Sequence, residues 1–180
     1  MSESLVALMR SLTLGVYVIG VYDGEKPNAF TACSVMPVSF DPVLLTVAIG
    51  RDHASLRMLL ASGRFSVNVL KREQLALARH FGECSGRDED KLARVPWRPG
   101  PAGTPLLDDA LACLACEVHG TMRTGDHELV VGRVVSGIIQ GGHARPMTYA
   151  DTGDMDGSAD LYAQRRVAEP PAPHESPEHH

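Results

Sequence analysis

A short polar stretch within an otherwise apolar segment is the best candidate for chemistry in this chain. The segment runs over residues 28–42 as N-A-F-T-A-C-S-V-M-P-V-S-F-D-P, and its four consecutive short side chains are Thr31, Ala32, Cys33 and Ser34. Such small side chains let a flat ligand approach the backbone and meet peptide N–H groups and hydroxyls. A ring system with alternating donors and acceptors suits that surface. The alternative is a strand edge that runs into a polar turn, because Pro37 and Pro42 cannot donate to a β-ladder.

A second polar segment, G-R-D-H-A-S at residues 50–55, comes directly before a helical apolar pattern. The N-terminus of a helix presents free N–H groups and the positive end of the helix dipole, and both favour a phosphate. Arg51 could add a charge and Ser55 a hydroxyl. Asp52 and Ser55 are also ordinary helix-capping residues, and capping explains the segment equally well.

The cysteines raise the question of a metal or redox site. They are Cys33, Cys84, Cys113 and Cys116, and C-L-A-C at 113–116 has the spacing of half a zinc site or of a thioredoxin-like pair. If that segment is a strand, positions three apart lie on opposite faces and cannot bind one ion or form a disulfide. We therefore interpret them as small core residues and expect no metal site. Cys33 differs because its neighbours are polar.

Two further segments invite a functional reading. The Asp-rich stretch D-T-G-D-M-D-G-S-A-D at residues 151–160 has the composition of a calcium loop. It lacks the flanking helices and the glutamate at the twelfth position of an EF-hand, so we do not predict calcium binding. Residues 83–105 form a long polar segment, which is often functional, and Lys91 supplies a cation within it. A solvated lysine is the simpler reading.

Hydrophobic periodicity predicts the elements that must position these residues. Apolar residues three and four apart predict helices over residues 5–12, 56–60 and 73–81, and apolar runs predict strands at 15–21, 28–36, 43–49, 65–70, 111–122 and 128–139. Asp23-Gly24 predicts a hairpin turn, and the strand at 43–49 is apolar on both faces and should be central. Six strands in mostly hairpin order predict a mainly β fold, an antiparallel barrel with short peripheral α-helices.

Length and charge limit the class of protein. The 180 residues, 44% hydrophobic and 22% charged, suffice for one domain, which we place at residues 1–166. The Pro-, Glu- and His-rich tail, residues 167–180, has the composition of a disordered segment. A net charge of -5 without a basic run argues against nucleic acid or a polybasic membrane partner. Neither a transmembrane-length apolar run nor a secretory signal is visible, so we expect a cytoplasmic protein.

Taken together in their order, the motifs resemble those of the flavin reductase-like family of FMN-binding split barrels. They are F-T-A-C-S-V-M-P-V-S-F-D-P, G-R-D-H-A-S, S-G-R-F-S-V-N-V-L, D-K-L, A-C-L-A-C-E-V and T-G-D-H-E-L-V-V-G-R-V, and the match covers about residues 9 to 150. The resemblance implies a homodimer of antiparallel split β-barrels. Many members are NAD(P)H:flavin oxidoreductases that supply reduced flavin to a separate monooxygenase.

The resemblance also implies a set of site residues. The isoalloxazine ring would lie against Thr31, Ala32, Cys33, Ser34 and Val35, with Ser39 near the ribityl chain. The phosphate would lie by Arg51, Ser55 and the backbone of Asp52, His53 and Ala54, with Lys91 as a further contact. His127, in the G-D-H motif, would be the catalytic-site histidine near the nicotinamide, and a simple turn histidine is the alternative.

The function implied is hydride transfer from NADH or NADPH to FMN, with FAD as the other candidate flavin. Because hydride passes directly from nicotinamide C4 to flavin N5, no protein acid, base or nucleophile is required. One departure from the family pattern is the ending M-T-Y-A-D-T-G-D-M-D-G-S-A-D-L-Y after Pro146. It favours the alternative of an FMN-binding electron-transfer protein, flavoredoxin-like or ferric-reductase-like. An oxidase or haem-binding branch fits the G-D-H motif less well.

Overall fold

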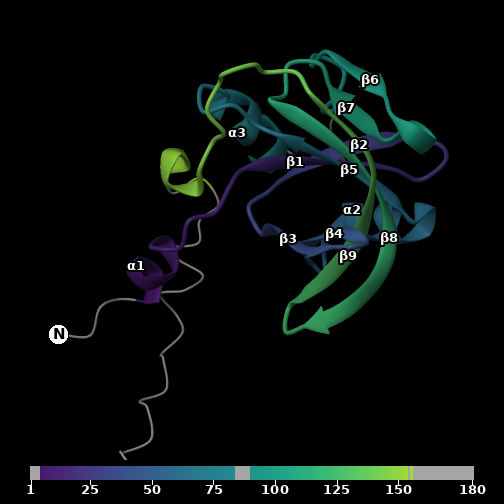
Figure 1. The fold of residues 1–180 in the computed structure, drawn as a ribbon, viewed down its shortest axis with the longest axis horizontal. Coiled ribbons are helices and arrows are strands. Elements are labelled where there is room, and N and C mark those ends of the chain that lie inside the picture. Colours follow the sequence, from purple (N-terminus) through teal and green to yellow (C-terminus); the bar gives the residue numbers. More distant parts are fainter. Residues whose placement is uncertain (1–4, 84–89, 154, 156–180) are drawn as a thin grey trace, which may run out of the picture.

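A curved antiparallel sheet forms most of the protein, for which a computed structural model describes residues 5–83, 90–153 and 155 (Figure 1). The helices are α1 (Leu5–Arg10), α2 (Ala54–Ser62) and α3 (Leu75–Glu83), with short 3-10 turns η1 (Pro101–Gly103) and η2 (Tyr149–Thr152). The strands are β1 (Tyr17–Tyr22), β2 (Pro27–Ala32), β3 (Val35–Phe40), β4 (Val43–Gly50), β5 (Arg64–Val69), β6 (Trp97–Pro99), β7 (Pro105–Leu107), β8 (Ala112–Thr124) and β9 (His127–Ile139). The prediction of a mainly antiparallel β fold with short helices is confirmed.

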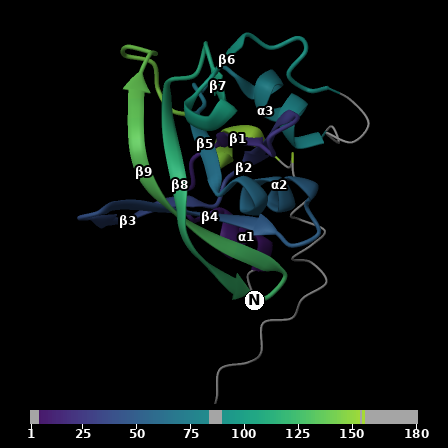
Figure 2. The same ribbon diagram turned by 90° about the vertical axis from the view of Figure 1, so that its right-hand side faces the viewer.

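Seven strands form the main sheet in the order β2-β1-β5-β8-β9-β4-β3, and every neighbouring pair is antiparallel. The sheet bends so far that β3 and β4 lie across from β1 and β5, with α2 between the two halves (Figures 1 and 2). The long β8–β9 hairpin spans both halves. Its register shifts twice, where Val135 of β9 and His119 of β8 have no partner in the pairing, and such bulges increase the local bend of a strand.

The predicted strand over residues 28–36 is wrong in one respect, because the chain bends at Cys33 and Ser34. β2 ends at Ala32 and lies at one edge of the sheet, whereas β3 begins at Val35 and lies at the other edge. The backbone N–H of Val35 donates to the carbonyl of Cys33 (3.0 Å), which makes a tight turn there. The short side chains thus lie where the chain crosses between the two edges of the sheet.

Two hydrophobic clusters pack on opposite faces of the central strands. One cluster is shared with α2 and includes Ile19 and Leu59; the other is shared with α3 and includes Val18 and Phe81. Cys116 belongs to the first cluster and Cys113 to the second, so the prediction that they lie on different faces is confirmed. Burial raises the pKa of the Cys116 thiol to about 12.

One predicted turn and one predicted strand position are confirmed. Asp23 and Gly24 join β1 to β2, with Gly24 at φ 102° and the Asp23 carboxylate accepting backbone N–H groups of Glu25 and Lys26. β4 lies between β3 and β9, so the central position predicted for the strand at 43–49 is also confirmed. Helix α2 ends at Gly63, whose φ of 66° suits glycine at the end of a helix.

Other segments differ from prediction or lie outside the described residues. The polar stretch 83–105 was predicted without a strand of its own in the main sheet, and it contains the short strand β6, which pairs with β7 in a separate two-stranded sheet. The first helix ends at Arg10, two residues before the predicted Leu12. Cys84, most of the Asp-rich segment and the tail at 167–180 lie outside the part of the chain that the structure describes.

Candidate functional site

One cavity gathers much of the predicted site. It measures about 250 Å³ and lies between β2, the end of β4, the end of α3 and the β8–β9 hairpin. Six of the residues predicted from the sequence line it, namely Thr31, Ala32, Cys33, Ser34, His53 and His127. Two segments far apart in the sequence, the short-side-chain stretch and the loop before α2, therefore share one cavity.

The backbone of β2 forms one wall of the cavity. Five consecutive residues, Phe30 to Ser34, line it, so the main chain itself faces the space. Because β2 is an edge strand, every second pair of its N–H and C=O groups points away from β1. The hydroxyl of Thr31 donates to the carbonyl of Ala78 in α3 (2.7 Å), which leaves its oxygen as an acceptor. This wall offers alternating donors and acceptors.

The turn between β4 and α2 forms a second wall. Gly50 and His53 line the cavity, while Arg51 and Asp52 are exposed in the turn between them. His53 is the N-cap of α2 but makes no side-chain capping hydrogen bond, and its ring lies 4.8 Å from that of Phe30. No side chain therefore caps the N–H groups of the first turn of α2, of which that of Leu56 donates to the His53 carbonyl (3.1 Å).

The tip of the β8–β9 hairpin brings His127 to the same place. His127 pairs with Gly50 across β4 and β9, and the Arg51 N–H donates to the Asp126 carbonyl (3.0 Å). The Asp126 carboxylate lies 2.8 Å from His127 Nδ1, and since a carboxylate only accepts, Nδ1 carries the proton. Nε2 is the ring nitrogen left to contact a ligand.

Several predicted residues do not line the cavity. Val35 packs against the hydrophobic cluster around α2, and Ser39 pairs with Leu44 between β3 and β4. Ala54 begins α2, and Ser55 is buried, where its hydroxyl accepts a hydrogen bond from the Asn28 side-chain amide (3.3 Å). Val35 and Ala54 directly follow lining residues in the sequence, whereas Ser39 lies farther along β3.

Lys91 is buried, so its reading as a solvated lysine is wrong. Only 3% of it is exposed, and its Nζ donates to the carbonyl of Phe81 (3.2 Å) at the end of α3 and lies 5.9 Å from the Phe81 ring centre. A cation at the C-terminal end of a helix is favoured by the helix dipole. Lys91 does not line the cavity. The residue that it contacts, Phe81, directly precedes the lining residue Gly82 in the sequence.

Sequence reasoning did not include six lining residues, which are Phe30, Ala48, Ile49, Gly50, Gly82 and Met155. Ala48 and Ile49 directly precede the polar segment at 50–55, and Gly50 is its first residue. A strand end next to such a segment was a usable signal. Gly82 and Met155 carried no signal, because they reach the cavity only through the packing of α3 and the chain after η2 against β2.

A neutral tyrosine lies close to the cysteine of the cavity. Tyr17 pairs with Ala32 across β1 and β2, and burial, followed by the nearby Cys33, raises the pKa of its phenol. The phenol therefore stays protonated at neutral pH. Charge near the cavity comes instead from Arg51 and from the Asp126–His127 pair.

Comparison with known proteins assigns the chain to a family. Residues 9–158 match the flavin reductase like domain. A probable flavin reductase of Rhizobium meliloti is 35% identical over 136 residues, which is 73% of this chain and 43% of that protein. The reductase subunit of a flavin-dependent monooxygenase of Mycobacterium tuberculosis is 34% identical over 130 residues, which is 72% of this chain and 68% of that protein.

A solved structure shows the same fold. The NADH:FAD oxidoreductase of Streptomyces globisporus superposes with a TM-score of 0.75 at 32% identity, covering 82% of this chain and 89% of that one. The same enzyme has been solved with NAD and FAD fragments. This chain spans less than half of the Rhizobium relative, so only the shared domain is compared there. On this sequence match and this fold, the chain belongs to the flavin reductase like domain family.

Proposed function

We propose that this protein is an NAD(P)H-dependent flavin reductase that supplies reduced flavin to a partner monooxygenase. The observation that carries the proposal is the single cavity in which the β2 backbone, the turn before α2 and His127 meet. The bound flavin would accept a hydride at N5 from nicotinamide C4. The names of the Mycobacterium and Streptomyces proteins, which combine flavin, NADH and a monooxygenase, support this assignment.

The residues present fit a flavin. The outward N–H and C=O groups of β2 offer the alternating donors and acceptors that the polar edge of an isoalloxazine ring needs. Reduction of the ring places negative charge on its N1–C2=O side, and backbone N–H groups stabilise such charge. The short side chains of Ala32, Cys33 and Ser34 keep this approach open.

The turn before α2 suits the phosphate of the flavin. Arg51 is exposed beside the cavity, and the first turn of α2 carries N–H groups that no side chain caps. Charge, free N–H groups and the helix dipole all favour an anion at this position. Arg51 and the backbone of residues 52–54 are thus the proposed phosphate contacts, while the burial of Ser55 leaves its hydroxyl a lesser role.

His127 would orient the nicotinamide over the flavin. Its Nδ1 is held by Asp126, so its Nε2 presents a fixed direction to a ligand at the mouth of the cavity. A neutral imidazole can hydrogen-bond the carboxamide, and a charged one can stabilise negative charge. Neither role requires the histidine to transfer the hydride.

The proposal is tested by mixing the purified protein with each pairing of NADH or NADPH and FMN or FAD. Loss of reduced-nicotinamide absorbance at a rate that depends on both flavin and protein is expected. No oxidation with any pairing would overturn the proposal. Tightly bound FMN that a protein partner reduces, but pyridine nucleotide does not, would instead select the electron-transfer alternative.

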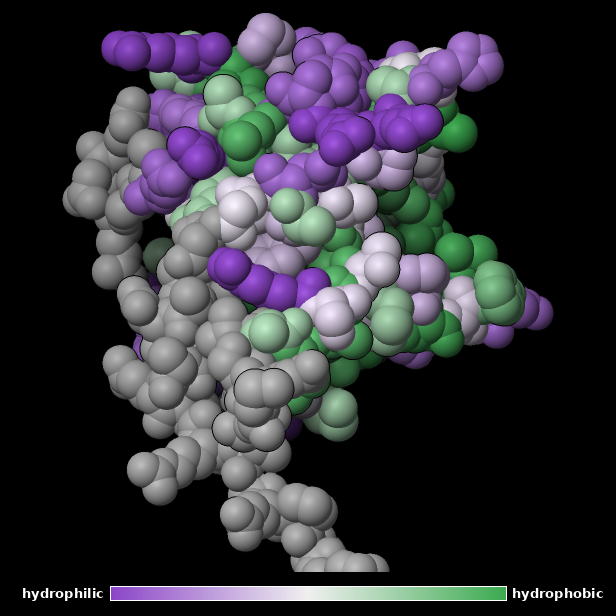
Figure 3. Space-filling model, turned by 90° about the vertical axis from the view of Figure 1, so that its left-hand side faces the viewer, coloured by the Kyte–Doolittle hydropathy of each residue, from purple (hydrophilic) through white to green (hydrophobic). Residues whose placement is uncertain are grey.

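A homodimer is part of the proposal. Exposed hydrophobic side chains gather on three adjacent strands, β3, β4 and β9, namely Met36, Val38, Phe40, Val43 and Val135. Figure 3 shows hydrophobic side chains reaching the surface below the hydrophilic top of one face. A cavity of about 250 Å³ is also smaller than most small-molecule sites, which span roughly 300 to 1,000 Å³. A second copy would cover the apolar strands and enclose more of the flavin.

We also propose that the protein works in the cytoplasm, where its nicotinamide donor is regenerated. Among the described residues, no helix has both the length and the apolar character needed to cross a membrane. The location is tested by fractionating cells that produce the tagged protein. Recovery of the reductase in the membrane or secreted fraction would contradict it.

A further inference from the structure

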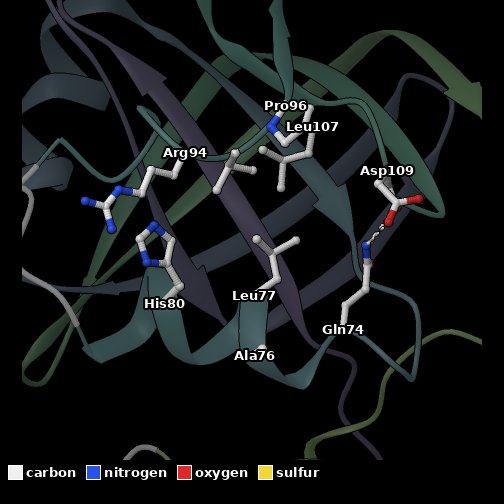
Figure 4. A pocket seen from close by; sticks show the side chains of 9 residues that line it. Gln74, Ala76, Leu77, His80, Arg94, Pro96, Leu107 and Asp109 are labelled. Atoms are coloured by element: carbon white, nitrogen blue, oxygen red, sulfur yellow. Dashed lines mark hydrogen bonds between the residues drawn. The ribbon is translucent and has the colours of Figure 1, made fainter.

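A second cavity lies on the side of α3 away from the flavin cavity. It measures about 500 Å³ and is formed by α3 and by the segment that runs from residue 94 to residue 109 (Figure 4). Leu77, Val95, Pro96 and Leu107 give it apolar walls. Its volume falls within the range of small-molecule sites, roughly 300 to 1,000 Å³. None of its lining residues belongs to the flavin cavity.

One end of this cavity is basic. Figure 4 shows Arg94 and His80 together at that end. His80 Nε2 donates to the Lys91 carbonyl (2.7 Å), since a carbonyl only accepts, so this nitrogen is already used. Arg94 is exposed at the mouth, and its guanidinium makes no hydrogen bond or ion pair among the residues that the structure describes. It is therefore the group that remains to bind an anion.

The acidic group at the other end is already neutralised. Asp109 lies opposite Arg94 in Figure 4. Its Oδ1 is 2.5 Å from Lys71 Nζ, and its Oδ2 accepts a hydrogen bond from Gln74 Nε2 (3.1 Å). The hydrogen bond and charge of Lys71 hold the pKa of Asp109 below its ordinary value, so it stays ionised and paired. The cavity is thus an apolar chamber with one available positive charge.

We propose that this cavity is a binding site for a small carboxylate with an aromatic or other apolar body. The body would lie between Leu77 and Leu107, and the carboxylate would meet Arg94, whose planar guanidinium matches a carboxylate in two parallel hydrogen bonds. This site is separate from the proposed reductase site, and its ligand would be neither the flavin nor the pyridine nucleotide.

Helix α3 places the two cavities back to back. Leu77 and His80 line the carboxylate cavity, whereas Gly82 lines the flavin cavity and the Ala78 carbonyl accepts the Thr31 hydroxyl. A ligand in one cavity therefore contacts the helix that forms a wall of the other. The test must separate binding at the two places, because an aromatic probe can also enter a flavin site.

The test is calorimetric titration of the FMN-saturated protein with 2-naphthoate and with its neutral counterpart, 2-naphthamide. We expect 2-naphthoate to bind with a Kd of about 1 mM or tighter at low salt, and 2-naphthamide about tenfold more weakly. The affinity for 2-naphthoate should fall as salt is added, because the Arg94 charge is exposed.

Variants locate the binding. Arg94→Gln should weaken 2-naphthoate binding about tenfold and leave 2-naphthamide binding unchanged. The matched control Arg79→Gln, exposed on α3 and outside both cavities, should change neither. Ala76→Trp adds bulk at an exposed lining position and should abolish both. Circular dichroism checks the fold of each variant. Absence of binding, or binding that FMN displaces or that Arg94→Gln leaves intact, would overturn the site.

Discussion

Among single residues, His127 is the one for which we propose the most specific chemical role. Its position at the start of β9, opposite Gly50, places the ring at the cavity, and Asp126 fixes which nitrogen faces a ligand. About half of its side chain, 47%, remains exposed, as a contact to a ligand that arrives and leaves requires. The G-D-H motif pointed to this histidine. It did not predict that the Asp126 carboxylate would hold Nδ1 of the ring.

His127→Asn should raise the KM for the nicotinamide donor about tenfold and leave the flavin Kd almost unchanged, because the contact that we propose for this cavity residue is to the nucleotide. Steady-state kinetics and flavin fluorescence titration measure the two quantities. The control is His119→Asn, at an exposed position of β8 outside the cavity. An equal loss in both variants, or a loss of flavin binding alone, would contradict the role of His127.

At the scale of single elements, polar residues inside buried strands explain much of the architecture. Asn68 of β5 is fully buried, and its side chain bonds three backbone groups: the carbonyls of Val18 (3.0 Å) and Pro105 (3.2 Å) and the N–H of Leu107 (2.8 Å). It therefore joins β5, β1 and β7. Periodicity could predict β5 but not this connection, which depends on residues far away in the sequence.

Asn68→Ala should lower the free energy of unfolding by about 2 kcal/mol, because it removes three buried hydrogen bonds, although the Pro105 carbonyl still accepts from the Ser66 hydroxyl. Urea denaturation measures the change. Thr121→Ala, at an exposed position of β8, serves as the control and should change stability by less than about 0.5 kcal/mol. A loss for Asn68→Ala no larger than that of the control would show that water replaces these bonds at no cost.

The β1–β2 turn should make a pH-dependent contribution to stability. The backbone N–H groups of Lys26 and Glu25 hold the pKa of Asp23 below its ordinary value. The unfolded chain then binds the proton more tightly, so this contribution is present above about pH 4 and is lost as the pH falls through the lowered pKa.

Asp23→Ala should accordingly cost about 1 kcal/mol at neutral pH, and the cost should shrink in acid. Unfolding titrations of both proteins from about pH 7 to about pH 3 follow the difference. Glu25→Ala is the matched control, because the turn uses only the backbone of Glu25. A difference that stays constant over this range would mean that the carboxylate charge does not stabilise the turn.

At the scale of the whole molecule, the exposed strands β3, β4 and β9 are the proposed dimer surface. Phe40 is 96% exposed, which is exceptional for a phenylalanine in a stable monomer. Phe40→Asp should convert the dimer to a monomer in sedimentation experiments, because it places a charge in an apolar interface. Arg57→Asp, at an exposed position of α2, should leave the dimer intact. A wild-type monomer, or a Phe40→Asp dimer, would contradict this surface.

The sequence alone determined the elements of this protein and the residues that carry its family resemblance. Periodicity, turn residues and local motifs act over a few neighbouring positions, so they predicted most of the strands, the hairpin at Asp23-Gly24 and both polar segments, but neither the break between β2 and β3 nor the short strands β6 and β7. The family resemblance added His53 and His127 to the short side chains Thr31 to Ser34 as predicted site residues, and all of these line one cavity.

Only the tertiary structure decided how those pieces meet. The bend at Cys33 and Ser34 exists because β2 and β3 pair with strands at opposite ends of the sheet. The packing of α3 decides three features: Lys91 is buried, Gly82 lines the cavity beside β2, and a second cavity forms beside Arg94. Such contacts join residues far apart in the chain, and their energies depend on the folded arrangement of both partners rather than on any local pattern.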